Sequence, residues 1–211
     1  MQIDLNNAEY YQVAFQDFLD MNWASAITNL TKIMESDPNF AGGNTATLLY
    51  EAYSALGQQY YSAGFYSDAA RTFPVGTISP QAQELIEVTK KALEAGISQA
   101  VPGNRISDIS ASVQKVVESA GFSVVRDFVG HGVGRSLHEG PQIANFGKRG
   151  KGPVIREGMT LAIEPMVNQG SWEIAIKDDG WTAVTADGSL SAHFEDSIAV
   201  MKGGPMILSA P

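Results

Sequence analysis

The sequence predicts an α+β protein in which helices come first and an antiparallel sheet follows. Apolar residues recur at helical spacing as far as about residue 119, whereas after Gly121 short β-branched or alternating runs are separated by glycines. The composition also changes near residue 70. Residues 1–70 contain all seven tyrosines and one basic residue against eight acidic ones, while 71–211 contain thirteen basic and fifteen acidic residues. Such a change indicates a domain boundary.

Helices are expected over the first 119 residues, at 8–20, 23–36, 45–62, 66–72, 80–100 and 107–119. Ser79 and Pro80 suit the start of the fifth helix, because proline is tolerated in the first turn. Ser107 is the expected N-cap of the sixth, with Asp108 in its first turn. The strand-like runs follow at 122–129, 159–167, 172–177, 181–185, 192–201 and 206–209. Helices packed beside an antiparallel sheet are typical of the α+β class.

Two segments, 21–30 and 64–73, resemble each other and resemble tetratricopeptide repeats. In the second unit Tyr53, Leu56, Gly57 and Tyr60 recur at helical spacing, and Ala69 and Phe73 would be the small and large residues of the partner helix. The resemblance implies a domain of helical hairpins over residues 1–67. It also implies a protein partner bound through these repeats.

All three histidines of the chain lie beside glycine or near a carboxylate. His131 and His138 belong to the glycine-rich segment 130–139, and His193 precedes Glu195 in the string His-Phe-Glu. Glu164 follows an apolar run in the string Ile-Glu-Pro-Met. Neutral imidazole and carboxylate oxygen are ligands of Mn, Fe, Co and Zn, and carboxylates can bridge two ions that activate one water. The pattern therefore indicates a hydrolytic metal site.

From residue 68 to residue 208 the chain resembles the C-terminal portion of type I methionine aminopeptidases. The matching segments are 68–76, 102–104, 130–139, 158–160, 164–166, 179–182 and 191–195. They follow the family's order and spacing over about two thirds of the chain. The resemblance implies that residues 68–211 form half of the pita-bread fold, with helices and an antiparallel sheet.

The resemblance also implies a set of site residues. The metal ligands are Asp68, His131, Glu164 and Glu195, and the cofactor is divalent Mn, Fe, Co or Zn. Glu164 further helps to activate the attacking water, and His138 donates to the scissile carbonyl and its developing oxyanion. Trp181 lines the pocket for the methionine side chain. The substrate is the N-terminus of a peptide or nascent chain.

Two residues of the family's site have no counterpart. Gly57 stands eleven residues before Asp68, where the family has a second aspartate, and no histidine precedes His131. We therefore expect one ion rather than two, and an activity that is impaired or lost. Asp196 stands where the family often has histidine, and its charge beside Glu195 is expected to loosen the site.

The residues alone leave other interpretations open. His131 and His138 are seven residues apart, cannot share one regular strand face, and could be loop histidines bound to backbone carbonyls. Asp68 could stabilise the start of a helix, and Trp181 could be a core residue. At the level of function, the alternative is a non-catalytic helical-repeat interaction or scaffold protein, or an engineered chimera.

Composition limits partners and location. The net charge of −9 argues against a nucleic-acid partner, and the basic cluster at 148–151 is short enough to be a solvated loop. The absence of an eighteen-residue apolar run argues against a membrane span. Residues 1–4 lack the basic region of a signal peptide, and the chain has no cysteine, so the cytoplasm is expected. Because half of a pseudo-symmetric fold leaves an unpaired sheet edge, we expect a homodimer.

Overall fold

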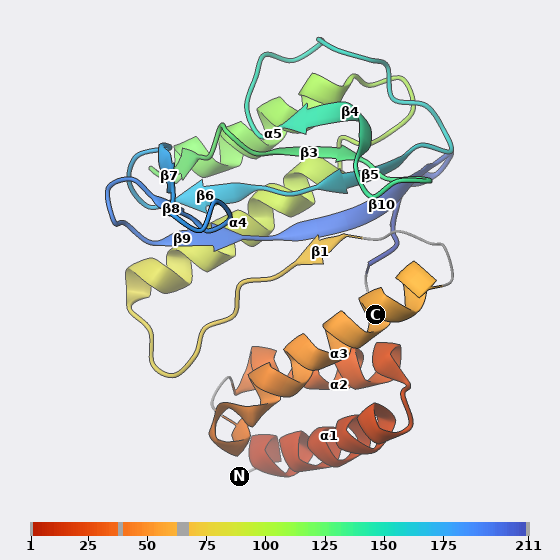
Figure 1. Ribbon diagram of the computed structural model, residues 1–211, viewed down its shortest axis with the longest axis vertical. Coiled ribbons are helices and arrows are strands. Elements are labelled where there is room, and N and C mark those ends of the chain that lie inside the picture. Colours follow the sequence, from red (N-terminus) through yellow and green to blue (C-terminus); the bar gives the residue numbers. More distant parts are fainter. Residues whose placement is uncertain (1, 38–39, 63–67, 210–211) are drawn as a thin grey trace. The chain divides into compact units, whose positions relative to one another are not determined.

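The computed structural model describes residues 2–37, 40–62 and 68–209, which divide into two compact units (Figure 1). The first unit comprises Met1–Phe65 and Phe73–Ser79, and the second comprises Tyr66–Thr72 and Pro80–Ala210. The sequence predicts one boundary, between residues 67 and 68. Phe73–Ser79 nevertheless belongs to the first unit, where Phe73 packs against the helical core.

The first unit consists of helices. They are α1 (Gln2–Leu19), α2 (Trp23–Ser36), the 3-10 helix η1 (Phe40–Gly43) and α3 (Asn44–Ser62). Helix α2 forms because its apolar residues recur every three to four positions, and it buries Ala26, Ile27, Leu30 and Ile33 on one face. The helices predicted at 8–20, 23–36 and 45–62 are therefore confirmed, with the first starting earlier than expected.

The helix predicted at 66–72 is wrong for the residues that the structure describes there. Ala69–Ala70 forms strand β1, which pairs antiparallel with Asp196 and Glu195 of β10 (Glu195–Met201). The hydroxyl of Ser197 accepts from the backbone N–H of Asp68 at 2.8 Å and donates to its carbonyl at 2.9 Å. These sheet contacts override the helix propensity of the two alanines.

The partner helix that a second tetratricopeptide repeat needs is therefore absent from residues 68–72. The other side chains invoked for that repeat, those of Tyr53, Leu56, Gly57 and Tyr60, lie outside the residues whose side chains are described.

Helices α4 (Pro80–Ile97) and α5 (Ile106–Ser119) cover one face of the main sheet in the second unit (Figure 1). Gly96 lets them approach closely, because a Cβ at this position would lie 2.9 Å from the side chain of Val113. Ser107 is not the N-cap of α5, because its hydroxyl accepts from the backbone N–H of Lys151 at 2.6 Å. Helix α5 instead begins after Arg105, whose N–H donates to Asp108 at 2.8 Å.

Every strand pair in the described part of the chain is antiparallel. The main sheet has the order β1-β10-β5-β3-β4, with β11 also on β10, and two small sheets have the orders β2-β6-β9 and β7-β8. The bounds are β2 Ser123–Val124, β3 Val129–Gly132, β4 Glu139–Ala144, β5 Thr160–Ile163, β6 Met166–Asn168, β7 Ile174–Ile176, β8 Ala183–Thr185, β9 Ser191–His193 and β11 Gly204–Ile207. The helices and an antiparallel sheet confirm the α+β class.

Two predicted strands are each divided between two sheets. Within the predicted strand 159–167, β5 ends at Ile163 and β6 begins after Pro165. Proline has no N–H to donate to a β-ladder. The run 192–201 is divided at Phe194 into β9 and β10. Glu164 and Glu195 therefore lie where the chain crosses between the main sheet and a small one, and strand β4 was not predicted at all.

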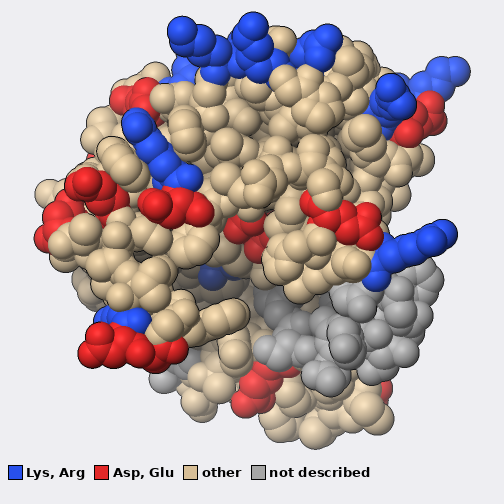
Figure 2. Space-filling model, turned by 45° about the horizontal axis from the view of Figure 1, so that its top comes forward, with Lys and Arg blue, Asp and Glu red and all other residues tan. Residues whose placement is uncertain are grey.

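Charged side chains of both signs lie on the face in Figure 2, with lysines and arginines gathered along its upper edge. Residues 148–151 are exposed, as expected for a solvated loop. Among the described residues, no helix combines the length and the apolar character that crossing a membrane requires.

Candidate metal centre

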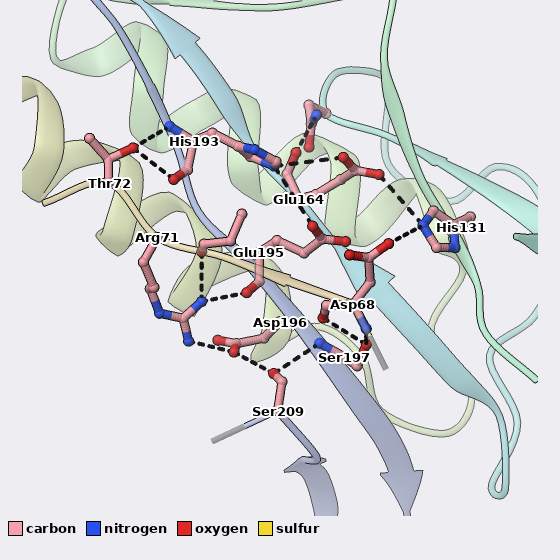
Figure 3. Close-up of polar contacts among 12 residues, drawn as sticks. Asp68, Arg71, Thr72, His131, Glu164, His193, Glu195, Asp196, Ser197 and Ser209 are labelled. Atoms are coloured by element: carbon pink, nitrogen blue, oxygen red, sulfur yellow. Dashed lines mark hydrogen bonds and ion pairs between the residues drawn. The ribbon is translucent and has the colours of Figure 1, made fainter. Parts of the chain in front are cut away.

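Asp68, His131, Glu164 and Glu195 converge on one place in the second unit (Figure 3). Asp68 precedes β1, His131 lies on β3, Glu164 follows β5, and Glu195 begins β10. The strand order β1-β10-β5-β3 makes these elements neighbours. Sheet register thus gathers residues that are up to 127 positions apart in the chain, from Asp68 to Glu195.

The glycines on either side of His131 allow its strand to fit between β4 and β5. A Cβ at Gly130 would overlap the carbonyl oxygen of Ala162, and one at Gly132 would overlap that of Gly140. Only glycine avoids both overlaps while keeping the strand in place. The Gly-His-Gly string therefore holds the His131 ring at a position fixed by close backbone packing.

His131 is at the centre of the cluster. Its Nε2 atom lies 3.7 Å from Asp68 Oδ2 and 3.9 Å from Glu164 Oε1. Ligand atoms of His131, Glu164 and Glu195 lie within 4.8 Å of one another, and so do those of Asp68, His131 and His138. Asp68 therefore lies in the cluster and not at the start of a helix.

The tautomer of His131 favours a cation in this place. Its Nδ1 atom is 2.9 Å from the carbonyl oxygen of Gly132, which can only accept, so Nδ1 carries the proton. In the neutral ring the lone pair of Nε2 then faces two carboxylates, which also present lone pairs. A divalent ion would accept electron pairs from the imidazole nitrogen and from both carboxylates. A hydrogen bond from the other ring nitrogen to a backbone carbonyl is also typical of metal-binding histidines.

The carboxylates are buried without enough positive charge to balance them. Burial, followed by the charge of Asp68, raises the pKa of Glu164 to about 7. Burial is also the main cause that raises the pKa of Glu195 to about 9, with Asp68, Glu164 and Asp196 adding to it and Arg71 opposing it. Glu195 is 4% exposed, and its Oε1 atom is buried without a hydrogen-bond partner. These residues fit a divalent ion, whose charge would reverse both pKa shifts.

Asp196, whose charge was expected to loosen the site, is paired with a cation. Its carboxylate binds Arg71 Nη2 at 2.5 Å and accepts from the Ser209 hydroxyl at 2.7 Å. Arg71 also donates to the backbone carbonyl of Glu195. The ion pair therefore holds the start of β10 against β1. The charge of Asp196 still raises the pKa of Glu195, and Arg71 opposes this effect.

A pocket of about 520 Å³ opens beside the cluster. It is lined by Phe128, Val129, His131, His138, Glu164, Met166, Ile176, Gly180 and Trp181. Trp181 is 88% exposed and so is not a core residue. His138 is also exposed, and its ring centroid lies 4.3 Å from that of His131. The two histidines are seven residues apart in the sequence but close in space, because the chain turns back between β3 and β4.

His193 belongs to the same cluster, although the sequence pattern assigned it no role. Its Nε2 atom lies 3.7 Å from Glu164 Oε2 and 4.0 Å from Glu195 Oε2, and it is buried without a hydrogen-bond partner. Burial lowers the pKa of His193, with Asp68 acting in the opposite direction. The signal in the sequence was its position two residues before Glu195.

Comparison with known proteins agrees with this geometry. The family model for metallopeptidase family M24 matches residues 55–202. The chain belongs to metallopeptidase family M24. The match leaves helices α1 and α2 outside the M24 region, and membership of the family implies a divalent metal.

Relatives of the M24 region include methionine aminopeptidases from several bacteria. The "Methionine aminopeptidase" of Clostridium perfringens is 57% identical over 146 residues, which are 69% of this chain and 59% of the relative. "Methionine aminopeptidase 1" of Bacillus subtilis is 51% identical over 146 residues, again 69% of this chain and 59% of the relative. The chain thus spans about three fifths of the length of the relatives it matches.

Solved structures support the fold. The crystal structure of methionine aminopeptidase from Thermotoga maritima matches with a TM-score of 0.69 and 53% identity, over 70% of this chain and 59% of that one. The M24 region therefore has the antiparallel architecture of the methionine aminopeptidase pita-bread fold. A prolidase from Pyrococcus horikoshii, at 24% identity and a TM-score of 0.54, shares the fold alone.

Proposed function

We propose that the chain is a methionine aminopeptidase-like metallohydrolase that removes methionine from the N-terminus of a peptide or nascent chain, with an impaired rate. The observation that carries the proposal is the convergence of Asp68, Glu164 and Glu195 on His131, whose free lone pair faces the carboxylates. The names of the Clostridium perfringens and Bacillus subtilis relatives support the choice of substrate.

Each residue of the cluster has a role in this proposal. Asp68, His131, Glu164 and Glu195 would hold one divalent ion, either Mn, Fe, Co or Zn. Bound there, such an ion polarises a carbonyl and makes water a better nucleophile. Glu164 would accept the proton of the attacking water and return it to the leaving amine, because its carboxylate lies beside the ion site next to His131.

The pocket would supply orientation and specificity. His138 lines the pocket, and in this proposal it would donate to the carbonyl oxygen of the scissile bond as negative charge develops there. Trp181, Met166 and Ile176 give the pocket an apolar side that suits a thioether side chain, since sulfur packs well against aromatic rings. Trp181 and His138 are therefore the proposed substrate-binding residues.

The proposal includes one ion rather than two. Gly57 lies within helix α3 and offers no carboxylate where the methionine aminopeptidase pattern has its second aspartate. Asp68 and Glu195 would then complete a single coordination sphere with His131 and Glu164. A second ion would lack the aspartate carboxylate that the pattern has at the position of Gly57.

Release of free methionine from a Met-Ala peptide tests the function. We expect slow release by the wild-type chain when Mn²⁺ or Co²⁺ is present, and none with Glu164→Gln, which keeps the shape of the side chain but cannot take up the proton. Glu94→Gln, at an exposed position on α4, is the matched control and should leave the rate unchanged. Equal release by the wild type and Glu164→Gln would contradict the proposed role of Glu164.

A second candidate is a non-catalytic binding protein that keeps the metal. The glycine at position 57 favours it, and so does the first unit, most of which precedes the M24 region and could bind a protein partner. The same assay separates the two candidates. Tight metal binding without any methionine release would favour the binding protein. For either candidate the absence of cysteine is consistent with the cytoplasm, which stays a prediction.

We further propose that the chain is a homodimer through its M24 region. Strand β11 pairs only with β10 among the described residues, and Met201, Met206, Ile207 and Leu208 expose apolar surface there. About two fifths of the relative's length lies outside its match to this chain, and a second copy of the chain would be the simplest cover for the open edge.

Light scattering on a size-exclusion column checks the dimer. We expect a mass of about twice 22.6 kDa at micromolar concentration. Met206→Lys, on β11, should shift the protein to the monomer because it places a charge at the apolar edge. Lys202→Glu, an exposed charge exchange in the adjacent turn, is the control. A folded wild-type monomer would refute the dimer.

A further inference from the structure

Glu164 lies between two imidazole rings. Its Oε1 atom is 3.9 Å from His131 Nε2, and its Oε2 atom is 3.7 Å from His193 Nε2 (Figure 3). His131 Nε2 is the lone-pair side of its ring, because Nδ1 donates to Gly132. The two oxygens of Glu164 therefore face nitrogens from different strands, β3 and β9.

The backbone of His193 is held at three points. Its N–H donates to the Thr72 hydroxyl at 2.9 Å, and the same hydroxyl donates to its carbonyl at 2.9 Å. His193 also pairs with Met166 in the register of β6 and β9, only two residues beyond Glu164. The ring thus projects toward Glu164 from a backbone held in place by Thr72 and by the β6–β9 pairing.

The Nε2 atom of His193 is a buried polar atom with no hydrogen-bond partner. Buried nitrogens of this kind are normally satisfied, and a small approach of the Glu164 side chain would bring Oε2 within hydrogen-bonding distance. Glu195 Oε2 is slightly farther away, at 4.0 Å. Glu164 Oε2 is therefore the nearer of the two carboxylate acceptors for a proton on this nitrogen.

We propose that His193 is a positioning residue whose Nε2–H donates to Glu164 Oε2 and leaves Glu164 Oε1 directed at the ion site beside His131. Carboxylates that bind a metal through one oxygen commonly accept a hydrogen bond on the other, which fixes their orientation. The inference rests on the proposed metal site and deepens it, because it assigns the third histidine of the chain to the same centre. His193 acts through Glu164 and does not contact the substrate.

Cobalt affinity of three variants tests the assignment. His193→Phe keeps a ring but removes the donor, and we expect Co²⁺ binding measured by calorimetry to weaken by about 10–100-fold. His193→Gln keeps an amide N–H that can reach Glu164, and its affinity should stay within about threefold of the wild type. The visible absorption of bound Co²⁺ should be the same in the wild type and His193→Gln. Glu94→Gln again serves as the control.

The outcomes separate this inference from the metal site itself. Thermal unfolding of the metal-free variants shows first that each is folded. Equal cobalt affinity in the wild type and His193→Phe would overturn the inference while leaving the metal site in place. Equal weakening in His193→Phe and His193→Gln would also overturn it, because a donor alone would not then suffice. A wild-type chain without affinity for Co²⁺ would overturn the metal site and the inference with it.

Discussion

Methionine release from a Met-Ala peptide is expected to be about 10⁴–10⁶-fold slower than release by the Bacillus subtilis methionine aminopeptidase measured beside it. The position of the second aspartate is occupied by Gly57, and no histidine precedes His131. Removing one oxyanion-hole donor lowers a rate by about 10²–10³-fold, and we assign a loss of the same size to each of the two missing residues. The effects multiply if the groups act independently.

The measurement is kcat/KM for both enzymes with the same peptide, metal and pH. Release by Glu164→Gln gives the background that the wild type must exceed. A wild-type value within tenfold of the Bacillus subtilis enzyme would contradict this prediction, and would mean that the cluster around His131 suffices for full activity.

The metal-free chain is expected to lose stability as the pH rises. Burial raises the pKa of Glu195 from its ordinary value of 4.5 to about 9, so between these values the folded protein holds a proton that the unfolded chain has released. The free energy of unfolding therefore falls with pH throughout this window. Glu164, whose pKa is raised to about 7, adds to the fall between pH 4.5 and 7.

Urea unfolding from pH 5 to pH 8.5, with a chelator or with Mn²⁺, measures this effect. Mn²⁺ takes the place of the protons, so its stabilisation should grow with pH and should be accompanied by proton release. Glu195→Gln, which cannot ionise, should flatten the dependence for the chelated protein. A stability that rises between pH 5 and 8.5 without metal would show that Glu195 is ionised and balanced by another charge.

Local patterns predicted most helices well. The regular apolar spacing of α2 and α4 predicted both, because one face of each helix packs on a core. The helix predicted at 66–72 was wrong because Ala69 and Ala70 form a strand. This strand is held by hydrogen bonds to β10, more than 120 residues away in the chain. The predicted N-cap of α5 was wrong for a similar reason, because the hydroxyl of Ser107 accepts a hydrogen bond from the distant backbone N–H of Lys151.

The candidate ligands could be predicted from the motifs, but their surroundings could not. The convergence of Asp68, His131 and Glu164 depends on strand order, which a single sequence does not display. Asp196 was expected to disturb Glu195 and does raise its pKa, but the ion pair of Asp196 with Arg71 could not be predicted from the sequence. His193 carried no prediction because its importance arises from a distance to Glu164 across two sheets.

Calorimetric titration of the chelated chain with Mn²⁺ or Co²⁺ tests the central claim, that this chain builds one metal centre around His131. We predict one tightly bound ion per chain in the wild type and no tight binding by His131→Ala, which removes the imidazole that belongs to both ligand groups. Glu94→Gln should bind like the wild type. Two equivalent tight sites, or none, would show that the chain does not build a single metal centre around His131.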